Sequence, residues 1–185
     1  MQRDLVVRAQ RGDLDAFSAL TAGTTDRLFG AARLILRDDE HAADAVQDAL
    51  LQAWLDLRGL RDPDRFDAWL NKLTVRASID EAKRLRRHRV DVELTSFITP
   101  AVAGLESGVA DRDQLERGFL RLEPEMRAVI VLHHYLDLPL PAVASTLGIP
   151  LGTAKSRLHR ALGQMRAALD ADSRVGSELT EGRSA

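Results

Sequence analysis

The C-terminal third of the chain contains a run of cations that is free of acidic residues. Between Asp137 and Asp170 there is no Asp or Glu. Four cations lie within that span: Lys155, Arg157, Arg160 and Arg166. A helix with this charge is suited to contacts with DNA phosphates and to reading base edges in the major groove. The alternative for the charges alone is the solvated surface of an ordinary helical bundle.

The residues around these cations predict a helix-turn-helix. Such a motif needs a small residue where its two helices touch, a glycine in the turn, and apolar residues that pin the second helix. Ala144 and Gly148 meet the first two needs, and Ile149, Ala154 and Leu158 meet the third. At about 100° per residue, the apolar side chains of the second helix share one face and the polar ones lie opposite. One face of this helix can therefore pack against the protein while the opposite face contacts DNA.

A second pattern lies in a helix that we expect from 41 to 57. One apolar set faces a core: Ala42, Val46, Ala49, Leu50, Ala53, Trp54 and Leu57. A stripe nearly opposite mixes carboxylates with leucines: Asp44, Asp48, Leu51 and Leu55. Residues 38–57 contain no Lys or Arg, so this stripe is typical of a surface that binds a basic protein. Coverage of the leucines by the protein's own N-terminal helix is the alternative.

The next predicted helix begins at Phe66 and continues into the most basic part of the chain. Its core-facing residues are Phe66, Trp69, Leu70, Leu73 and Ala77. Its cations lie along a neighbouring edge and in the following turns: Lys72, Arg76, Lys83, Arg84, Arg86, Arg87 and Arg89. A basic surface beside aromatic rings is suited to single-stranded DNA. The spacing of the aromatic residues nevertheless favours the core over a stacking platform.

Composition and periodicity predict an all-α protein made of two small helical domains. The chain has 185 residues, of which 45% are hydrophobic and 29% charged, as in soluble folded proteins. Helix-favouring residues dominate, and only 4% are aromatic. The helical period is lost between Val90 and Val109. We therefore expect a first domain at 1–89, a flexible linker at 90–110, a helix-turn-helix domain at 111–170 and a polar tail at 171–185.

Several classes of function find no support in the sequence. The absence of cysteine excludes disulfide frameworks, thiolate zinc sites and cysteine nucleophiles. The pattern of residues suggests no carboxylate pair, phosphate loop or metal cluster, so we expect no cofactor, no metal and no enzymatic activity. Neither a signal peptide nor a membrane span is evident. We expect a cytoplasmic protein without membrane contact of its own.

Three segments in this order resemble motifs of the compact sigma factors of bacterial RNA polymerase, the extracytoplasmic-function group (group IV) of the sigma-70 family. DAVQDALLQAW at 44–54 is similar to the polymerase-binding helix of that family. FDAWL at 66–70, with SIDEAKR at 78–84, is similar to its minus-ten helix. GTAKSRLHRA at 152–161 is similar to its minus-thirty-five recognition helix. The likeness extends over most of the chain.

The resemblance implies core RNA polymerase, promoter DNA and an anti-sigma factor as partners. Contacts with the polymerase, chiefly the coiled coil of its β′ subunit and also its β subunit, would involve Asp44, Gln47, Asp48, Leu51 and Leu55. Contacts with the opening minus-ten element would involve Arg61, Lys72, Arg76, Lys83, Arg84 and Arg87. Contacts with the minus-thirty-five element would involve Thr153, Lys155, Ser156, Arg157, His159 and Arg160. The linker would pass through the polymerase.

Two other functions remain as alternatives at this stage. A free-standing helix-turn-helix repressor or activator would use its N-terminal domain to sense a signal or to dimerise. A nucleic-acid-modifying enzyme would need a polar catalytic cluster, and the sequence offers no candidate for one.

Overall fold

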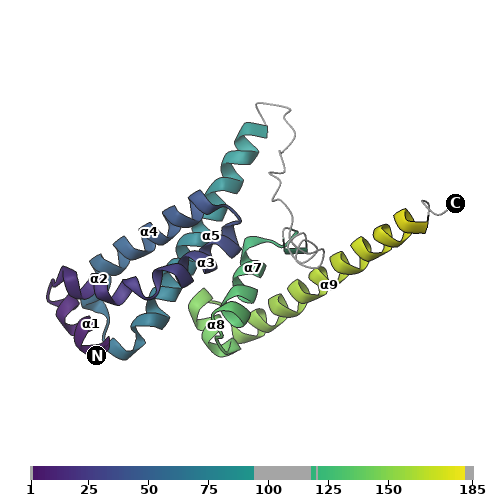
Figure 1. Ribbon diagram of the computed structural model, residues 1–185. Helices are drawn as coiled ribbons and strands as arrows, with labels where there is room; N and C mark the ends of the chain where they lie inside the picture. Colours follow the sequence, from purple (N-terminus) through teal and green to yellow (C-terminus); the bar gives the residue numbers. More distant parts are fainter. Residues whose placement is uncertain (1, 94–117, 120, 182–185) are drawn as a thin grey trace.

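The regular structure of this protein is helical throughout the part that can be described. The computed structural model describes residues 2–93, 118–119 and 121–181. Eight α-helices follow one another along these ranges, with short 3-10 and π turns between some of them (Figure 1). The all-α class expected from composition is confirmed.

Five helices form the N-terminal half. They are α1 (Gln2–Gln10), α2 (Leu14–Ala22), α3 (Thr25–Leu36), α4 (Asp39–Asp56) and α5 (Phe66–Glu93), with 3-10 turns η1 (Leu57–Gly59) and η2 (Pro63–Arg65) before α5. Arg37 has a left-handed backbone (φ 63°) that ends α3. Asp38 then caps α4, because its Oδ1 accepts the backbone N–H of His41 at 2.9 Å. The helix that carries the predicted acidic stripe therefore has a defined start.

The core of this half contains the apolar faces that the sequence pattern assigns to it. Phe66 at the start of α5 is fully buried, and Leu28 and Leu57 are almost as deeply buried. The rings of Phe17 and Trp54 meet edge to face at 5.2 Å, which joins α2 to α4. Phe66 is thus a core residue and has no surface on which a DNA base could stack.

The C-terminal half contains the predicted helix-turn-helix. The elements of this half are α7 (Pro124–Ile130), a π turn η3 (Val131–Tyr135), α8 (Leu140–Leu147) and α9 (Leu151–Glu181), and the motif is formed by α8 and α9. Gly148 ends α8 with a left-handed backbone (φ 66°), which a residue without a Cβ adopts at little cost. Ala144 and Ala154, on the two sides of this turn, are buried. The expected small residues therefore allow α8 and α9 to pack closely.

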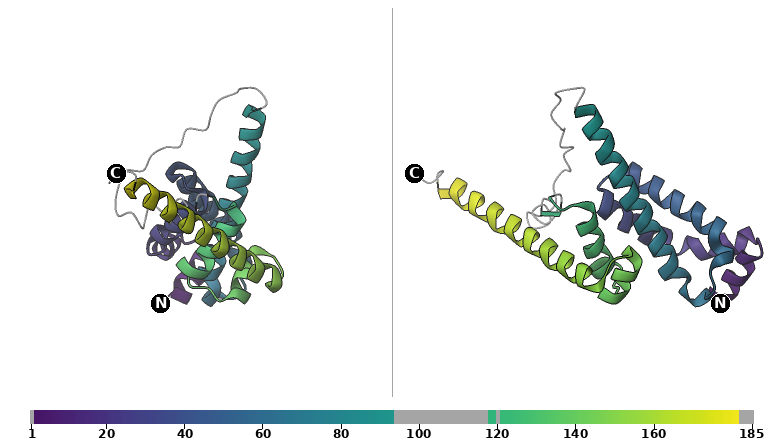
Figure 2. Two further views of the ribbon diagram at one scale, coloured as in Figure 1. Left: turned by 90° about the vertical axis from the view of Figure 1, so that its right-hand side faces the viewer. Right: turned by 180° about the vertical axis from the view of Figure 1, so that it is seen from behind.

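The two halves share a second hydrophobic core, a feature that the sequence pattern does not predict. The N-terminal half contributes Ala31, Ile35, Val75 and Ile79 from α3 and α5. The C-terminal half contributes Ala128, Val129, Val131, Leu132, Leu136 and Val143. In two views at right angles, α7 and α8 lie against the N-terminal bundle while α9 extends away from it (Figure 2). We call this contact the junction.

Two predicted boundaries differ from the structure. Helix α5 continues to Glu93, so the first residues assigned to the linker at 90–110 are helical, and 94–110 lie outside the described residues. Helix α9 continues to Glu181, although the chain after residue 170 was expected to be a frayed polar tail. Polarity alone misleads here, because 171–181 contains no proline and only one residue, Gly176, that strongly disfavours a helix.

Candidate functional site

The acidic stripe of α4 is on the surface, as predicted. Asp44, Gln47 and Asp48 are exposed. Leu51 and Leu55 are 58% and 63% exposed, and because they are four residues apart on α4 they form one apolar patch beside the carboxylates. The alternative that the protein's own N-terminal helix covers these leucines is therefore wrong. The stripe is free to contact another molecule.

A groove of about 610 Å³ lies between the facing edges of α4 and α5, and its lining includes residues that the sequence assigns to two different partners. Its lining residues are Asp44, Gln47 and Asp48 from α4, and Ala77, Asp80, Glu81, Arg84 and Arg87 from α5. Arg84 and Arg87 thus lie opposite the acidic stripe. Their positive charge faces the predicted polymerase-binding surface as well as solvent.

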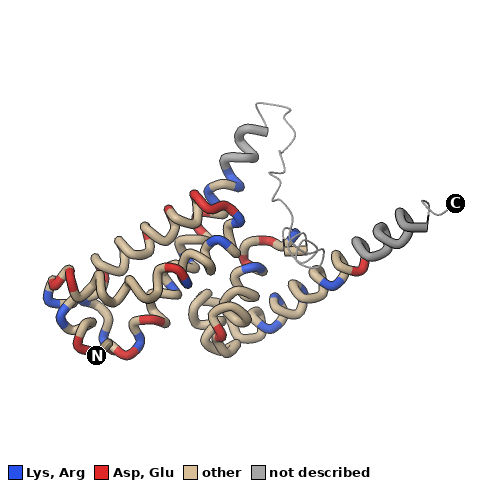
Figure 3. The backbone as a smooth tube through the Cα atoms, viewed as in Figure 1, with Lys and Arg blue, Asp and Glu red and all other residues tan. Residues whose placement is uncertain are grey.

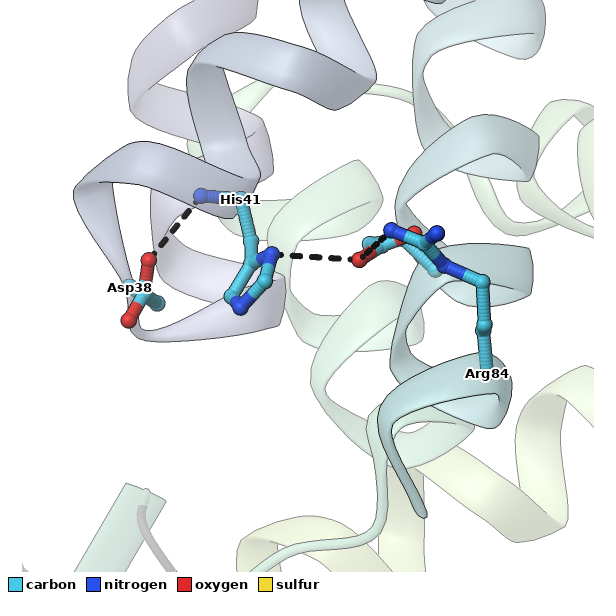
Figure 4. A network of polar contacts seen from close by, with 4 residues as sticks. Asp38, His41 and Arg84 are labelled. Carbon is cyan, nitrogen blue, oxygen red and sulfur yellow. Dashed lines mark hydrogen bonds and ion pairs between the residues drawn. The ribbon is translucent and has the colours of Figure 1, made fainter. Parts of the chain in front are cut away.

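Arg84 is held within a network of polar contacts at this groove (Figure 4). Its Nε and Nη2 each donate a hydrogen bond of 2.8 Å to the Glu81 carboxylate, which lowers the pKa of Glu81. Nδ1 of His41, from α4, lies 3.1 Å from the same carboxylate but without hydrogen-bond alignment. The network ties α4 to α5, and the guanidinium of Arg84 makes an intramolecular contact although its side chain is exposed.

The other cations predicted for the minus-ten element do not form one surface. Arg61 is exposed in the loop between η1 and η2, and Lys72 is half-buried. Nη2 of Arg76 lies 3.8 Å from the point that a Cβ on Gly148 would occupy, so it adjoins the turn of the helix-turn-helix. Lys83 lies 3.9 Å from a carboxylate oxygen of its own helix and 4.0 Å from one on α7. Arg76 and Lys83 therefore face the C-terminal half.

The polar face of α9 agrees with the prediction more closely. Exposed side chains on this face are Lys155, Ser156, His159 and Arg160, and half-buried ones are Thr153 and Arg157. Ala154 and Ala161, on the other face, are fully buried. The described part of α9 carries Lys and Arg but no acidic residue before Asp170 (Figure 3). The structure thus groups all six predicted minus-thirty-five residues on one helix, with the most exposed of them pointing to solvent.

Two arginines at the junction were missed by the sequence reasoning. Arg127 of α7 is buried and donates from Nε to the Ile35 carbonyl (2.6 Å) and from Nη1 to the Leu122 carbonyl (2.8 Å). Arg27 of α3 donates from Nη2 to the Leu136 carbonyl at 3.1 Å. The available signal for Arg127 was a cation directly before the apolar run at 128–132, because a buried charge needs specific partners.

Burial lowers the pKa of Arg127 to about 10, and the nearby charge of Arg37 acts in the same direction. The side chain still carries its charge at neutral pH. Its main partners are carbonyl oxygens, of which that of Ile35 belongs to the last turn of α3, where the helix dipole favours a cation. Arg127 thus joins the C-terminal half to the end of a helix in the N-terminal half.

The described residues contain neither a metal-binding cluster nor a membrane-spanning helix. No three His, Cys, Asp or Glu side chains gather there as a metal site. Within the same ranges no helix combines the length and the apolar character needed to cross a bilayer.

Comparison with known proteins shows which family the chain belongs to. Residues 24–88 match the family model for Sigma-70 region 2, and residues 112–165 match the model for Sigma-70, region 4. The RNA polymerase sigma factor CnrH of Cupriavidus metallidurans is 33% identical over 184 residues, which covers 92% of this chain and 95% of that protein. The ECF RNA polymerase sigma factor SigM of Mycobacterium tuberculosis is 30% identical over 163 residues, with coverage of 88% and 81%.

A solved structure agrees with this result. CnrH in complex with the cytosolic domain of CnrY matches with a TM-score of 0.64 and 29% identity, over 92% of this chain and 98% of that one. Both family models, full-length relatives and a solved fold therefore agree, and the chain belongs to the extracytoplasmic-function sigma factors of the sigma-70 family.

Proposed function

We propose that α4 is the surface through which this sigma factor binds core RNA polymerase. The observation that carries this proposal is the pair of exposed leucines, Leu51 and Leu55, in the same stripe as Asp44 and Asp48. Apolar side chains supply binding energy when a partner covers them, and the surrounding carboxylates favour a basic partner. The coiled coil of the polymerase β′ subunit is the partner that the family resemblance implies, with further contacts to the β subunit.

The polar face of α9 would read the minus-thirty-five element from the major groove. Its six candidate residues are Thr153, Lys155, Ser156, Arg157, His159 and Arg160. They supply phosphate-binding cations and hydrogen-bonding groups on a helix of the right kind. The minus-ten element would be held as it melts by Arg61, Lys72, Arg76, Lys83, Arg84 and Arg87 on the loop before α5 and on α5 itself.

On this proposal the protein acts by binding its partners and carries out no covalent chemistry itself. The protein would select the promoter and hold the melted strand, while the polymerase makes the RNA. It would act in the cytoplasm, where the polymerase works, without a cofactor. An anti-sigma factor is a further expected partner, since the relative CnrH was solved in complex with CnrY.

Pull-down and abortive transcription with a pool of promoter fragments test this function. Three samples are compared: the protein alone, core polymerase alone, and both together. The proposal expects polymerase binding, and specific initiation only in the mixture. A protein that bound specific DNA alone, and gained nothing from polymerase, would instead behave as a free-standing helix-turn-helix regulator.

A further inference from the structure

Helix α1 carries side chains that bond to the chain between α4 and α5. This segment, residues 57–65, contains η1, η2 and the three residues that join them, and we call it the connecting loop. Helix α1 lies beside it (Figure 1). Val6 and Ala9, the buried face of α1, belong to the core that also contains Leu57, the first residue of the loop. Since α1 is fixed by this core, it can support the loop.

Gln10, the last residue of α1, holds two main-chain groups of the connecting loop. Its Nε2 donates to the carbonyl oxygen of Leu57 at 3.1 Å and to that of Leu60 at 2.8 Å. Leu60 lies between η1 and η2, so its carbonyl needs a donor from another part of the chain. The side chain of Gln10 is half-buried, which limits competition from water for these bonds. Gln10 therefore fixes both ends of the turn at 57–60.

The carboxylates that follow this turn have partners of their own. Nη1 of Arg3, on α1, lies 2.6 Å from an oxygen of Asp64, and Nε2 of Gln2 donates to Asp67 at 2.7 Å. Asp62 accepts the backbone N–H of Asp64 at 3.1 Å. These side chains are exposed, so each bond by itself contributes little to stability. The carboxylates closest in sequence after Arg61 are nevertheless bound to groups other than its guanidinium.

Two arginines of the connecting loop are free to bind another molecule. Arg58 and Arg61 are exposed, and within the part of the chain that the structure describes neither side chain has a hydrogen-bond or ion-pair partner. Arg58 lies within the turn at 57–60 and Arg61 directly follows it, so the conformation of this turn determines where both guanidinium groups can reach. A guanidinium in this state can bind a phosphate without breaking an internal ion pair.

We propose that Gln10 is a positioning residue for promoter melting: it holds the turn at 57–60 so that Arg58 and Arg61 together bind the backbone of the minus-ten strand. Arg58 is then a second phosphate contact beside Arg61. A loop that already has its binding conformation loses less conformational freedom when DNA binds, which increases affinity. The inference rests on the proposed function, because it concerns the same promoter-binding surface.

The first test measures the connecting loop in the free protein by hydrogen exchange. Gln10→Met keeps a long unbranched side chain of similar helix propensity but has no N–H to donate. The N–H of Leu60, which bonds to the Leu57 carbonyl at 3.1 Å, reports on the turn. Loss of two hydrogen bonds should speed its exchange by about tenfold, while exchange in α3 stays unchanged. Equal exchange at Leu60 in the two proteins would overturn the proposal.

The second test measures binding of single-stranded DNA by the protein in complex with core polymerase. The probe is the labelled non-template strand of a fragment on which the complex initiates. Arg58→Gln with Arg61→Gln should flatten the dependence of log affinity on log salt by about 1.4 units, since each contact with a single strand contributes about 0.7. An unchanged slope would overturn the role of the two arginines.

Combining these variants tests whether Gln10 acts through the arginines. Gln10→Met alone should weaken binding of the strand by about tenfold, because fewer molecules have the loop in its binding conformation. In the chain that already lacks both arginines, the same change should have an effect of about twofold or less, since the groups that Gln10 positions are absent. A tenfold loss in both backgrounds would overturn the proposal, because it would show a structural effect that does not depend on Arg58 and Arg61.

Asp38→Ala is the matched control for stability. It removes the cap of α4 and so destabilises the same half without changing a contact of the connecting loop. Its affinity for the strand should equal that of the wild type. An equal loss of affinity in Asp38→Ala and Gln10→Met would overturn the positioning role, because lower stability would then explain both.

The readouts separate this inference from the proposed function. Hydrogen exchange is measured without polymerase, so a protein that shows faster exchange in Gln10→Met but initiates on no fragment would contradict the proposed function and leave the support of the loop by Gln10 established. A protein that initiates normally, with unchanged exchange and strand affinity in Gln10→Met, would contradict only the inference about Gln10.

Discussion

The exposed leucines of α4 allow a quantitative prediction for polymerase binding. In Leu51→Ala with Leu55→Ala, the carboxylates of the stripe and the buried face of the helix remain intact. Burial of a whole leucine side chain is worth about 2 kcal/mol. Leu51 and Leu55 are 58% and 63% exposed, so docking can still bury over half of each one. The double variant should therefore lose about 1 kcal/mol per site, about 2 kcal/mol in all, which is a 30-fold weaker Kd.

The assay is a titration of labelled protein with core polymerase, read by fluorescence anisotropy. Leu14→Ala is the matched control, because Leu14 is 61% exposed but belongs to α2 and not to the stripe on α4. Its Kd should equal that of the wild type. Thermal unfolding of both variants should be almost unchanged, since the replaced side chains are largely in water in the folded protein.

A Kd for the double variant within twofold of the wild type would refute the reasoning that the stripe is the docking surface. An equal loss in Leu14→Ala would refute it too, because a general effect of surface apolarity would then explain the data. A large loss accompanied by a lower unfolding temperature would mean that the leucines support α4 itself.

Three further predictions concern α9, the start of α4 and the groove. Replacing Arg157 and Arg160 with Gln should weaken promoter binding by the polymerase complex and flatten its salt dependence by about 1.8 units, and an unchanged slope would place them away from the phosphates. Asp38→Ala should lower the free energy of unfolding by about 1 kcal/mol in urea titrations through loss of the α4 cap, whereas Asp38→Asn should retain most of it. Arg84→Gln should raise the pKa of Glu81 toward its ordinary value, as read by NMR titration of the carboxyl carbon. Since the folded-state pKa of Glu81 is lowered, the stability from this pair should be present above the unfolded-state pKa and disappear as the pH falls through the folded-state value; a stability difference that persists in acid would contradict this origin.

The predictions that proved correct depend on local patterns. The two faces of α4 follow from the helical period of its leucines, alanines and carboxylates, and the exposure of Leu51 and Leu55 agrees with that period. The helix-turn-helix follows from Gly148 and the small residues on either side of it. In both segments the interactions that determine the local structure lie within a few residues of one another. Neighbouring positions in the sequence are therefore enough to predict it.

The basic residues of α5 show what such local patterns do not indicate. The sequence groups Arg76, Lys83 and Arg84 as one set of DNA contacts. In the structure Arg84 is bonded to Glu81 at the groove, while Arg76 and Lys83 face the C-terminal half. A helical projection gives the direction of a side chain around its own helix, but not the element that packs opposite it.

The sequence by itself determined that this chain is helical, that it has an acidic stripe with exposed leucines, and that it carries a basic recognition helix. The tertiary structure alone decided that the two halves share a core and that Arg127 reaches the end of α3. Helix formation and amphipathicity depend on residues three or four positions apart, which the sequence displays directly. The partner of a buried charge depends on which distant segment packs against it, and only the folded chain brings such segments together.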